Sequence, residues 1–231
     1  MAGAARGVAA SIVKVEIWSD VVCPWCYIGK RRFERALAGF AHRDEVEVTW
    51  RSFELDPRAA RGPRSAEEDP VERLARKYGM TREAAEAAQA RVTAQAAEEG
   101  LAYRLDAARP SNTFDAHRLL HLAAERGVQG AVKERFLAAH FVEARPLGDP
   151  ETLVAVAAEA GLDEAAAREV LGGDAYADEV AGDERQAAEL GISGVPFFVL
   201  DRRYGISGAQ PAELIAQALE RAWADTDTTS R

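Results

Sequence analysis

Residues 13–26, Val-Lys-Val-Glu-Ile-Trp-Ser-Asp-Val-Val-Cys-Pro-Trp-Cys, decide the fold of this chain. The first six alternate apolar and polar side chains and are rich in β-branched residues, which predicts a β-strand. Pro24 suits the first turn of a helix, because the N–H that it lacks would have no partner there. Apolar side chains then follow at positions 33, 36, 37 and 40, which is helical spacing. A Cys-x-x-Cys motif therefore stands where a strand passes into a helix.

Two further segments complete this pattern. Residues 45–53 alternate again, so strand, helix and strand predict a parallel βαβ unit with a right-handed crossover. Toward the C-terminus, the apolar run at 195–200, a turn at 201–202 and the residues at 203–207 predict a β-hairpin. A helix follows from Pro211, so the chain has the order βαβ, then ββα, and belongs to the α/β class.

Residues 57–190 have a different character, because they are rich in alanine and glutamate and carry repeated helix start and stop signals. They predict an inserted all-helical domain between the two parts, 12–56 and 191–223, of a discontinuous α/β domain. Residues 1–11 and 224–231 are expected to be flexible termini. The helices predicted in the insertion are 70–78, 81–100, 111–127, 150–161, 163–171 and 175–190.

Composition narrows the function. The chain has 231 residues, with 29 Lys and Arg against 38 Asp and Glu, so its formal charge is 29 − 38 = −9. This acidic balance argues against nucleic-acid binding, which needs a concentrated positive field. The apolar runs are too short for a membrane helix, and the N-terminus lacks the apolar core of a secretory signal, so we expect a cytoplasmic protein without membrane contact.

Cys23 and Cys26 are the only cysteines, so all thiol chemistry is concentrated at one place. A helix N-terminus stabilises a thiolate, which predicts that Cys23 is the nucleophile and that Cys26 resolves the mixed disulfide. The alternatives are a pair of unremarkable thiols and half of a zinc site completed by His117 and His121. Zinc is disfavoured, because about ninety residues separate the pairs, whereas finger-type sites use about 12–15.

A second piece of the site is predicted at Val195 and Pro196, inside the run Gly-Val-Pro-Phe-Phe at 194–198. Proline is normally excluded from the middle of a strand. We expect the Val195–Pro196 bond to be cis and to present the backbone of Val195 beside Cys23, where an extended substrate can pair with it. The alternative is a trans proline that begins an edge strand.

Four blocks of this sequence resemble the FrnE-like branch of the DsbA family of thioredoxin-fold oxidoreductases, in the family's order and over roughly residues 12–223. The resemblance implies a thioredoxin fold with an inserted helical domain, dithiol-disulfide exchange at Cys23 and Cys26, and a cis Pro196 facing them. Some FrnE-like proteins carry an additional cysteine pair toward the C-terminus. This chain has none, which excludes a relay between two dithiols. The blocks are 19–30 (Ser-Asp-Val-Val-Cys-Pro-Trp-Cys-Tyr-Ile-Gly-Lys), 112–119 (Asn-Thr-Phe-Asp-Ala-His-Arg-Leu), 191–199 (Gly-Ile-Ser-Gly-Val-Pro-Phe-Phe-Val) and 206–211 (Ile-Ser-Gly-Ala-Gln-Pro).

Further substrate-binding residues are expected around the dithiol. Pro24 and Trp25 lie between the cysteines, and the Trp25 ring suits an apolar rim. In related glutathione-dependent isomerases and kappa-class transferases the helix that matches 112–119 lies near the cleft, which implies that Asn112, His117 and Arg118 line one wall of it. The alternative is that Asn112 caps the helix and that His117 is a packed core residue. The helical insertion is expected to form a lid over the dithiol.

The leading functional prediction is a thiol-disulfide oxidoreductase or isomerase that exchanges disulfides with protein or small-molecule substrates through its CPWC dithiol. Its redox-active disulfide needs no bound cofactor or metal, and its partner is a thiol reductant or oxidant, with glutathione as a candidate co-substrate. One alternative is a glutathione-dependent isomerase or transferase of the kappa or 2-hydroxychromene-2-carboxylate isomerase type, although those relatives typically have serine at the first cysteine. Another is a peptide-binding chaperone.

Overall fold

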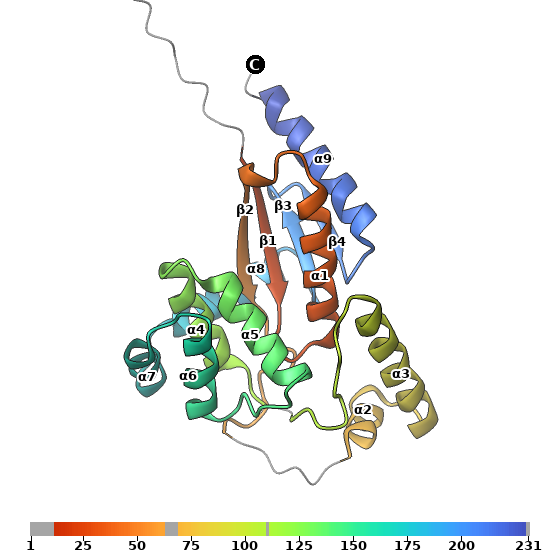
Figure 1. The fold of residues 1–231 in the computed structure, drawn as a ribbon, viewed down its shortest axis with the longest axis vertical. Helices are drawn as coiled ribbons and strands as arrows, with labels where there is room; N and C mark the ends of the chain where they lie inside the picture. Colours follow the sequence, from red (N-terminus) through yellow and green to blue (C-terminus); the bar gives the residue numbers. More distant parts are fainter. Residues whose placement is uncertain (1–11, 63–68, 110, 230–231) are drawn as a thin grey trace, which may run out of the picture.

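The computed structural model describes residues 12–62, 69–109 and 111–229, and it has the predicted arrangement of a βαβ unit, a helical segment and a ββα unit (Figure 1). The strands are β1 (Val13–Ser19), β2 (Val46–Ser52), β3 (Phe197–Leu200) and β4 (Tyr204–Ser207). The longer helices are α1 (Pro24–Gly39), α2 (Pro70–Tyr78), α3 (Arg82–Glu98), α4 (Phe114–Glu125), α5 (Gln129–Phe141), α6 (Pro150–Glu159), α7 (Glu164–Gly172), α8 (Ala177–Glu189) and α9 (Ala212–Thr229), and a short 3-10 turn, η1, covers Arg43–Glu45.

The four strands form one mixed sheet in the order β2-β1-β3-β4. Strand β1 runs parallel to β2, with Val13 opposite Val46, and antiparallel to β3, with Ile17 opposite Phe198. Strands β3 and β4 form the predicted hairpin. This topology confirms the thioredoxin fold with a helical insertion that the order βαβ, then ββα, and the family resemblance implied.

Helices cover both faces of the sheet. On one face, α1 and α9 bury Phe33 and Leu219 against apolar strand residues such as Phe198. On the other face, α8 packs against the sheet, and the indole N–H of Trp18 donates to the backbone carbonyl of Asp183 at 2.9 Å. Helix α8 was predicted as the last element of the insertion, and its contacts make it part of the layer that encloses the sheet.

The remaining helices of the insertion lie beyond the end of the sheet at which β1 stops, in two groups (Figure 1). Helices α4 to α7 share one apolar core, which also takes in Val21 from the segment leading to the cysteines. Helices α2 and α3 form a hairpin, and Glu99, just after α3, forms ion pairs with Arg32 and Arg35 of α1. The insertion therefore packs back onto the α/β core on both sides of the N-terminal end of α1.

Local capping explains four of the helix starts. The side chains of Asp69, Thr81, Asp149 and Asp163 each accept a backbone N–H in the first turn of α2, α3, α6 and α7. Helix α5 was not predicted, because its N-cap residue, Val128, offers no side-chain acceptor and leaves no start signal in the sequence.

The C-terminal prediction was wrong for residues 224–229, because α9 continues to Thr229. Tyr204 of β4 donates a hydrogen bond to Asp225, Arg203 forms an ion pair with Asp225 at 3.3 Å, and the Thr226 hydroxyl donates to the Trp223 carbonyl. These contacts hold the end of α9 against the hairpin. Residues 1–11, which were also predicted to be flexible, lie outside the described residues.

Candidate active site

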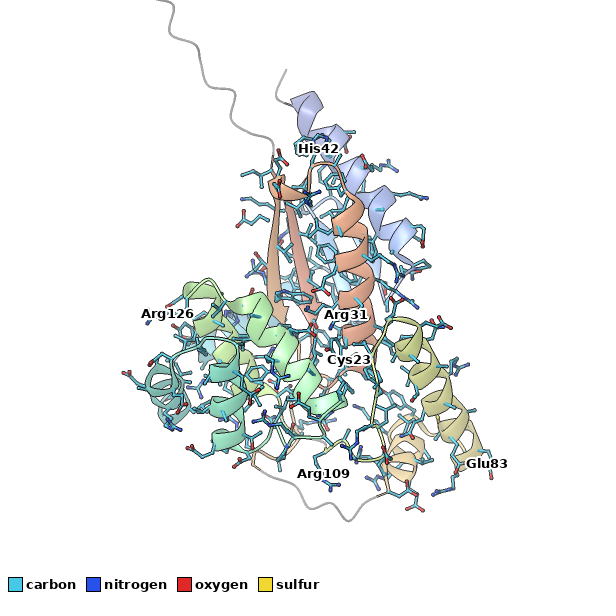
Figure 2. All side chains as sticks on the ribbon, in the orientation of Figure 1. Cys23, Arg31, His42, Glu83, Arg109 and Arg126 are labelled. Carbon is cyan, nitrogen blue, oxygen red and sulfur yellow. The ribbon has the colours of Figure 1, made fainter. Side chains whose placement is uncertain are left out.

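Cys23 is the N-cap residue of α1, and Pro24 follows it in the first helical turn. The backbone N–H of Cys26 donates to the carbonyl of Cys23 at 3.0 Å, so the two cysteines lie one turn apart (Figure 2 labels Cys23). Both are free thiols. Cys23 is 4% exposed and Cys26 is 0% exposed, so both residues are buried and Cys23 is the more exposed of the two.

The loop before β3 meets the first cysteine. The thiol of Cys23 donates to the backbone carbonyl of Val195 at 3.4 Å, and the Val195–Pro196 bond is cis. Gly29, one turn after Cys26, allows the ring of Pro196 to approach α1, because a Cβ atom on Gly29 would lie 2.8 Å from Pro196 Cγ. The structure therefore brings Cys23, Cys26, Val195 and Pro196 together.

The two thiols interact, and this interaction governs their ionisation. The hydrogen bond between them and burial raise the pKa of Cys23 well above its usual range. Burial opposes ionisation of Cys26 as well, but the hydrogen bond from Cys23 and the charge of Lys133 outweigh it and lower the pKa of Cys26. The two thiols therefore titrate as a coupled pair, and the first negative charge belongs to the pair. Transfer of the remaining proton between the sulfurs gives the Cys23 thiolate.

Two buried charged side chains lie behind the dithiol. Lys133, from α5, is 0% exposed, and its ammonium donates to the carbonyl of Ser19 at 3.1 Å. Asp20 is also 0% exposed and accepts the backbone N–H of Leu55 at 2.8 Å. Burial opposes ionisation of Asp20, yet the facing imidazole of His117 and this backbone bond lower its pKa.

His117 lies against this buried group rather than in an open cleft. Its Nε2 is 3.4 Å from Oδ1 of Asp20, and the residue is 0% exposed. Neither ring nitrogen has a partner with hydrogen-bond geometry. His121 points elsewhere, with its Nε2 3.1 Å from Asp183 Oδ2. The two histidines therefore serve different contacts, and among the described residues no group of His, Cys, Asp and Glu is arranged to hold a metal ion.

Asn112 and Arg118 are buried, and their hydrogen bonds hold the start of α4 and the connection between α7 and α8. The Oδ1 atom of Asn112 accepts the N–H of Phe114, the first residue of α4, and its amide donates to Glu54 at 3.3 Å. The Arg118 guanidinium donates to backbone carbonyls between α7 and α8, among them Ala175 at 2.8 Å. These contacts direct Arg118 into the helical insertion and not toward the cysteines.

In the turn between the cysteines, the Trp25 side chain is exposed and the Pro24 carbonyl is held by a hydrogen bond. Trp25 is 37% exposed, which makes it one of the exposed large apolar side chains of the described chain. On the other side, the buried hydroxyl of Tyr103 donates to the carbonyl of Pro24 at 2.6 Å, and the Tyr103 ring stacks on Phe141 of α5. The insertion thus holds the backbone of the Cys-x-x-Cys turn while Trp25 faces outward.

Sequence reasoning missed Asp20, Lys133 and Tyr103 as neighbours of the dithiol. A signal for Lys133 was present, because it shares one helical face with Leu137 and Phe141, four and eight positions later. A lysine on an apolar face is rarely buried without a functional or charged partner. The signal was not used, because the helix that carries Lys133 had not been predicted.

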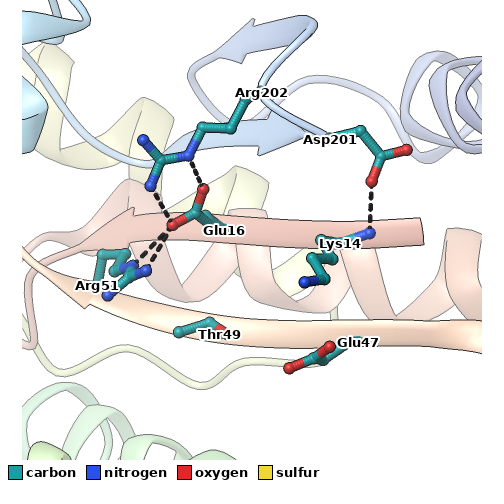
Figure 3. A pocket seen from close by; sticks show the side chains of 7 residues that line it. All are labelled: Lys14, Glu16, Glu47, Thr49, Arg51, Asp201 and Arg202. Carbon is teal, nitrogen blue, oxygen red and sulfur yellow. Dashed lines mark hydrogen bonds and ion pairs between the residues drawn. The ribbon is translucent and has the colours of Figure 1, made fainter. Parts of the chain in front are cut away.

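A separate hollow of about 420 Å³ lies on the sheet, lined by residues of β1, β2 and the β3–β4 turn (Figure 3). Its carboxylate Glu16 lies between Arg51 and Arg202, and the Asp201 carboxylate accepts the backbone N–H of Lys14 at 2.7 Å. Both left-handed residues of the hairpin turn, Asp201 (φ 48°) and Arg202 (φ 56°), are held by these contacts. Glu16 thus pairs with both guanidinium groups, and these contacts stabilise the hairpin turn.

Comparison with known proteins agrees with this geometry. Residues 14–220 match the family model for the DSBA-like thioredoxin domain. The chain is 30% identical over 213 residues to the uncharacterized protein YwbO of Bacillus subtilis (strain 168), covering 90% of this chain and 96% of that protein. The crystal structure of the probable DsbA oxidoreductase SCO1869 from Streptomyces coelicolor is 54% identical, with a TM-score of 0.85 over 92% of this chain and 90% of that chain.

A more distant likeness concerns the fold alone. The cytosolic disulfide reductase DsbM from Pseudomonas aeruginosa, solved with GSH, is 18% identical, with a TM-score of 0.57 over 94% of this chain and 98% of that chain. Among the described residues, no helix is both long and apolar enough to cross a membrane.

Proposed function

Because the chain belongs to the DsbA-like thioredoxin domain family, we propose that it is a thiol-disulfide oxidoreductase or isomerase that works through Cys23 and Cys26. One observation carries the proposal: two free thiols lie one turn apart at the start of α1, with the sulfur of Cys23 against the carbonyl of Val195. An extended substrate at this loop has a backbone edge to bind beside the attacking sulfur.

In the proposed reaction the thiolate of Cys23 attacks one sulfur of a substrate disulfide. A mixed disulfide forms, and the other substrate sulfur leaves as a thiolate that takes up a proton. Cys26 then attacks Cys23 Sγ, which forms the Cys23–Cys26 disulfide and releases the second substrate thiol. The substrate gains two electrons and two protons, and the enzyme dithiol loses them. The same steps in reverse oxidise a substrate dithiol.

The proposed partners are disulfide- or thiol-containing proteins or small molecules, with a thiol such as glutathione to restore the dithiol. Support for glutathione comes from the Pseudomonas reductase, whose structure was solved with GSH. That protein is also described as cytosolic, which supports our proposal of a cytoplasmic location. The exposed ring of Trp25 is proposed to contact the substrate beside Cys23. A net charge of −9 is consistent with our proposal that nucleic acid is not a partner.

Cysteine variants test the function. Cys26→Ala should accumulate mixed disulfides with a model protein substrate, whereas Cys23→Ala should accumulate none. The wild type should form a reversible intramolecular disulfide in glutathione redox buffers and should reduce insulin. If wild-type protein forms no disulfide in these buffers, the proposal is wrong. A glutathione-dependent isomerase would instead keep its turnover in the Cys26→Ala variant, because its chemistry uses the sulfur of glutathione.

A further inference from the structure

We propose that Lys133, which the helical insertion supplies, is the fixed cation that stabilises the thiolate of the Cys23–Cys26 pair and so favours its reduced form. The inference rests on the proposed dithiol function. It gives the insertion a chemical role, in addition to any part in covering the cleft.

Lys133 is carried by α5 and contacts strands β1 and β2. It lies on α5 between Val132 and Glu134, and it is 0% exposed. Its ammonium donates to the carbonyl of Ser19, the last residue of β1, and lies 5.7 Å from the ring centroid of Trp50 on β2. The cation is therefore held at the end of the strand that leads into the dithiol, where Ser19 stands four residues before Cys23.

The ammonium of Lys133 has no ion-pair partner in the part of the chain that the structure describes, although the charge of the buried Asp20 acts on it. Within the described residues, no carboxylate lies at ion-pair distance from Lys133. The surrounding titratable groups are Asp20, Cys23, Cys26 and Lys30. Of these, Lys30 is paired with Glu34 and with Glu134 at 2.6 Å. Asp20 faces His117. The sulfur pair is thus the group near Lys133 that gains a negative charge during the proposed reaction.

A buried cation without an ion-pair partner is costly, so the fold retains Lys133 at the expense of stability. Burial lowers the pKa of Lys133 to about 8, with the charges of Cys26 and Asp20 opposing this effect. The ammonium form therefore still predominates at neutral pH. A thiolate at Cys23 or Cys26 attracts the Lys133 ammonium and so reduces the free-energy cost of burying it. The neutral disulfide carries no charge and gives no such attraction. Lys133 accordingly stabilises the reduced state relative to the oxidised state, which makes the disulfide a stronger oxidant.

The test uses the full-length Lys133→Met variant, whose unbranched side chain is one heavy atom shorter than that of lysine and carries no charge. Thiolate absorbance near 240 nm, followed against pH, should show a higher pKa for the first thiol ionisation. The equilibrium with reduced and oxidised glutathione should shift roughly tenfold toward the disulfide, a potential about 30 mV more negative. Lys30→Met is the matched control, because it removes a buried lysine whose charge is already paired, and it should shift the equilibrium much less.

A second pair of variants separates a direct effect from one through Asp20. Asp20→Asn should shift both readouts in the opposite direction, because the carboxylate raises the pKa of Cys23. Lys133→Met should still shift them in the Asp20→Asn background, where loss of the ammonium cannot act through the Asp20 carboxylate. Unchanged thiol pKa and glutathione equilibrium in both backgrounds would overturn the inference. A wild type that forms no disulfide would instead refute the proposed function itself.

Discussion

The ring of Pro196 lies against the backbone of Gly29, so close that a Cβ atom at position 29 would come within 2.8 Å of Pro196 Cγ. This contact joins the second turn of α1 to the loop whose Val195 carbonyl touches Cys23. A methyl group at Gly29 must therefore displace either the helix or the loop.

We expect Gly29→Ala to destabilise the protein by about 1–3 kcal/mol, as overpacking usually does. It should also slow insulin reduction more than it slows alkylation of Cys23 by a small reagent, because the loop moves and the sulfur remains. Gly39→Ala is the control in the same helix, since nothing lies within 4 Å of its added Cβ. Denaturant unfolding and the two rate assays check the prediction, and equal behaviour of both variants would contradict it.

Tyr103→Phe should loosen the turn between the cysteines. The variant keeps the ring that stacks on Phe141 and loses the 2.6 Å hydrogen bond to the Pro24 carbonyl. We expect a loss of about 0.5–1.5 kcal/mol in the free energy of unfolding. Amide hydrogen exchange of residues 25–28 should also become faster.

Tyr78→Phe is the matched control for this prediction, because Tyr78 is 58% exposed on α2. It should leave both the free energy of unfolding and exchange at the dithiol turn unchanged. If Tyr103→Phe matches this control in exchange, the hydrogen bond does not hold the turn.

The local sequence predicted the α/β core and several helices of the insertion because the signals for both are short-range. The alternation of residues 13–18, Pro24 at the first turn, and the capping residue Asp149 each act within a few positions. Residues around the dithiol that come from the insertion were not predictable in this way. Lys133 reaches Ser19 across 114 positions and Tyr103 reaches Pro24 across 79, and a single sequence holds no spacing rule for such contacts.

The family resemblance led to the prediction that Asn112, His117 and Arg118 line a wall of the cleft. The family resemblance located their helix beside the site, and α4 indeed brings His117 to Asp20. Resemblance does not fix which way each side chain points along the helix. Arg118 is one position later, a rotation of about 100°, and its guanidinium meets the carbonyl of Ala175.

Glu54 should make stability depend on pH. Burial, with the charges of Glu184 and Asp20, raises its pKa to about 7. In the unfolded chain the carboxyl ionises near its ordinary value of 4.5, so between about pH 4.5 and pH 7 the folded state binds more protons. This group therefore stabilises the fold at low pH, and that contribution is lost as pH rises through 7.

The Glu54→Gln variant removes this titration and can still accept the amide of Asn112. We expect the wild type to lose stability relative to the variant between pH 5 and pH 7.5, as measured by urea unfolding at both values. Glu184→Gln should shift the loss to lower pH, because one repelling charge is removed. A stability difference between wild type and Glu54→Gln that is the same at both pH values would refute the prediction.

Trp25 should contribute to substrate affinity and little to stability. Its ring is 37% exposed beside Cys23, at the opening of the dithiol site. Trp25→Ala should raise KM for reduction of a protein disulfide roughly fivefold to tenfold, about 1–1.4 kcal/mol of binding free energy. The free energy of unfolding should change by less than about 0.5 kcal/mol, as for most exposed positions.

Leu214→Ala provides the control, because Leu214 on α9 is 42% exposed and lies on a helix that contributes no residue to the site. Alkylation of Cys23 by a small reagent should be unchanged in both variants, since neither side chain acts on the thiolate. An equal KM for the two variants would show that the Trp25 ring does not bind substrate, and a parallel fall in Cys23 alkylation would show that it acts on the cysteine turn instead.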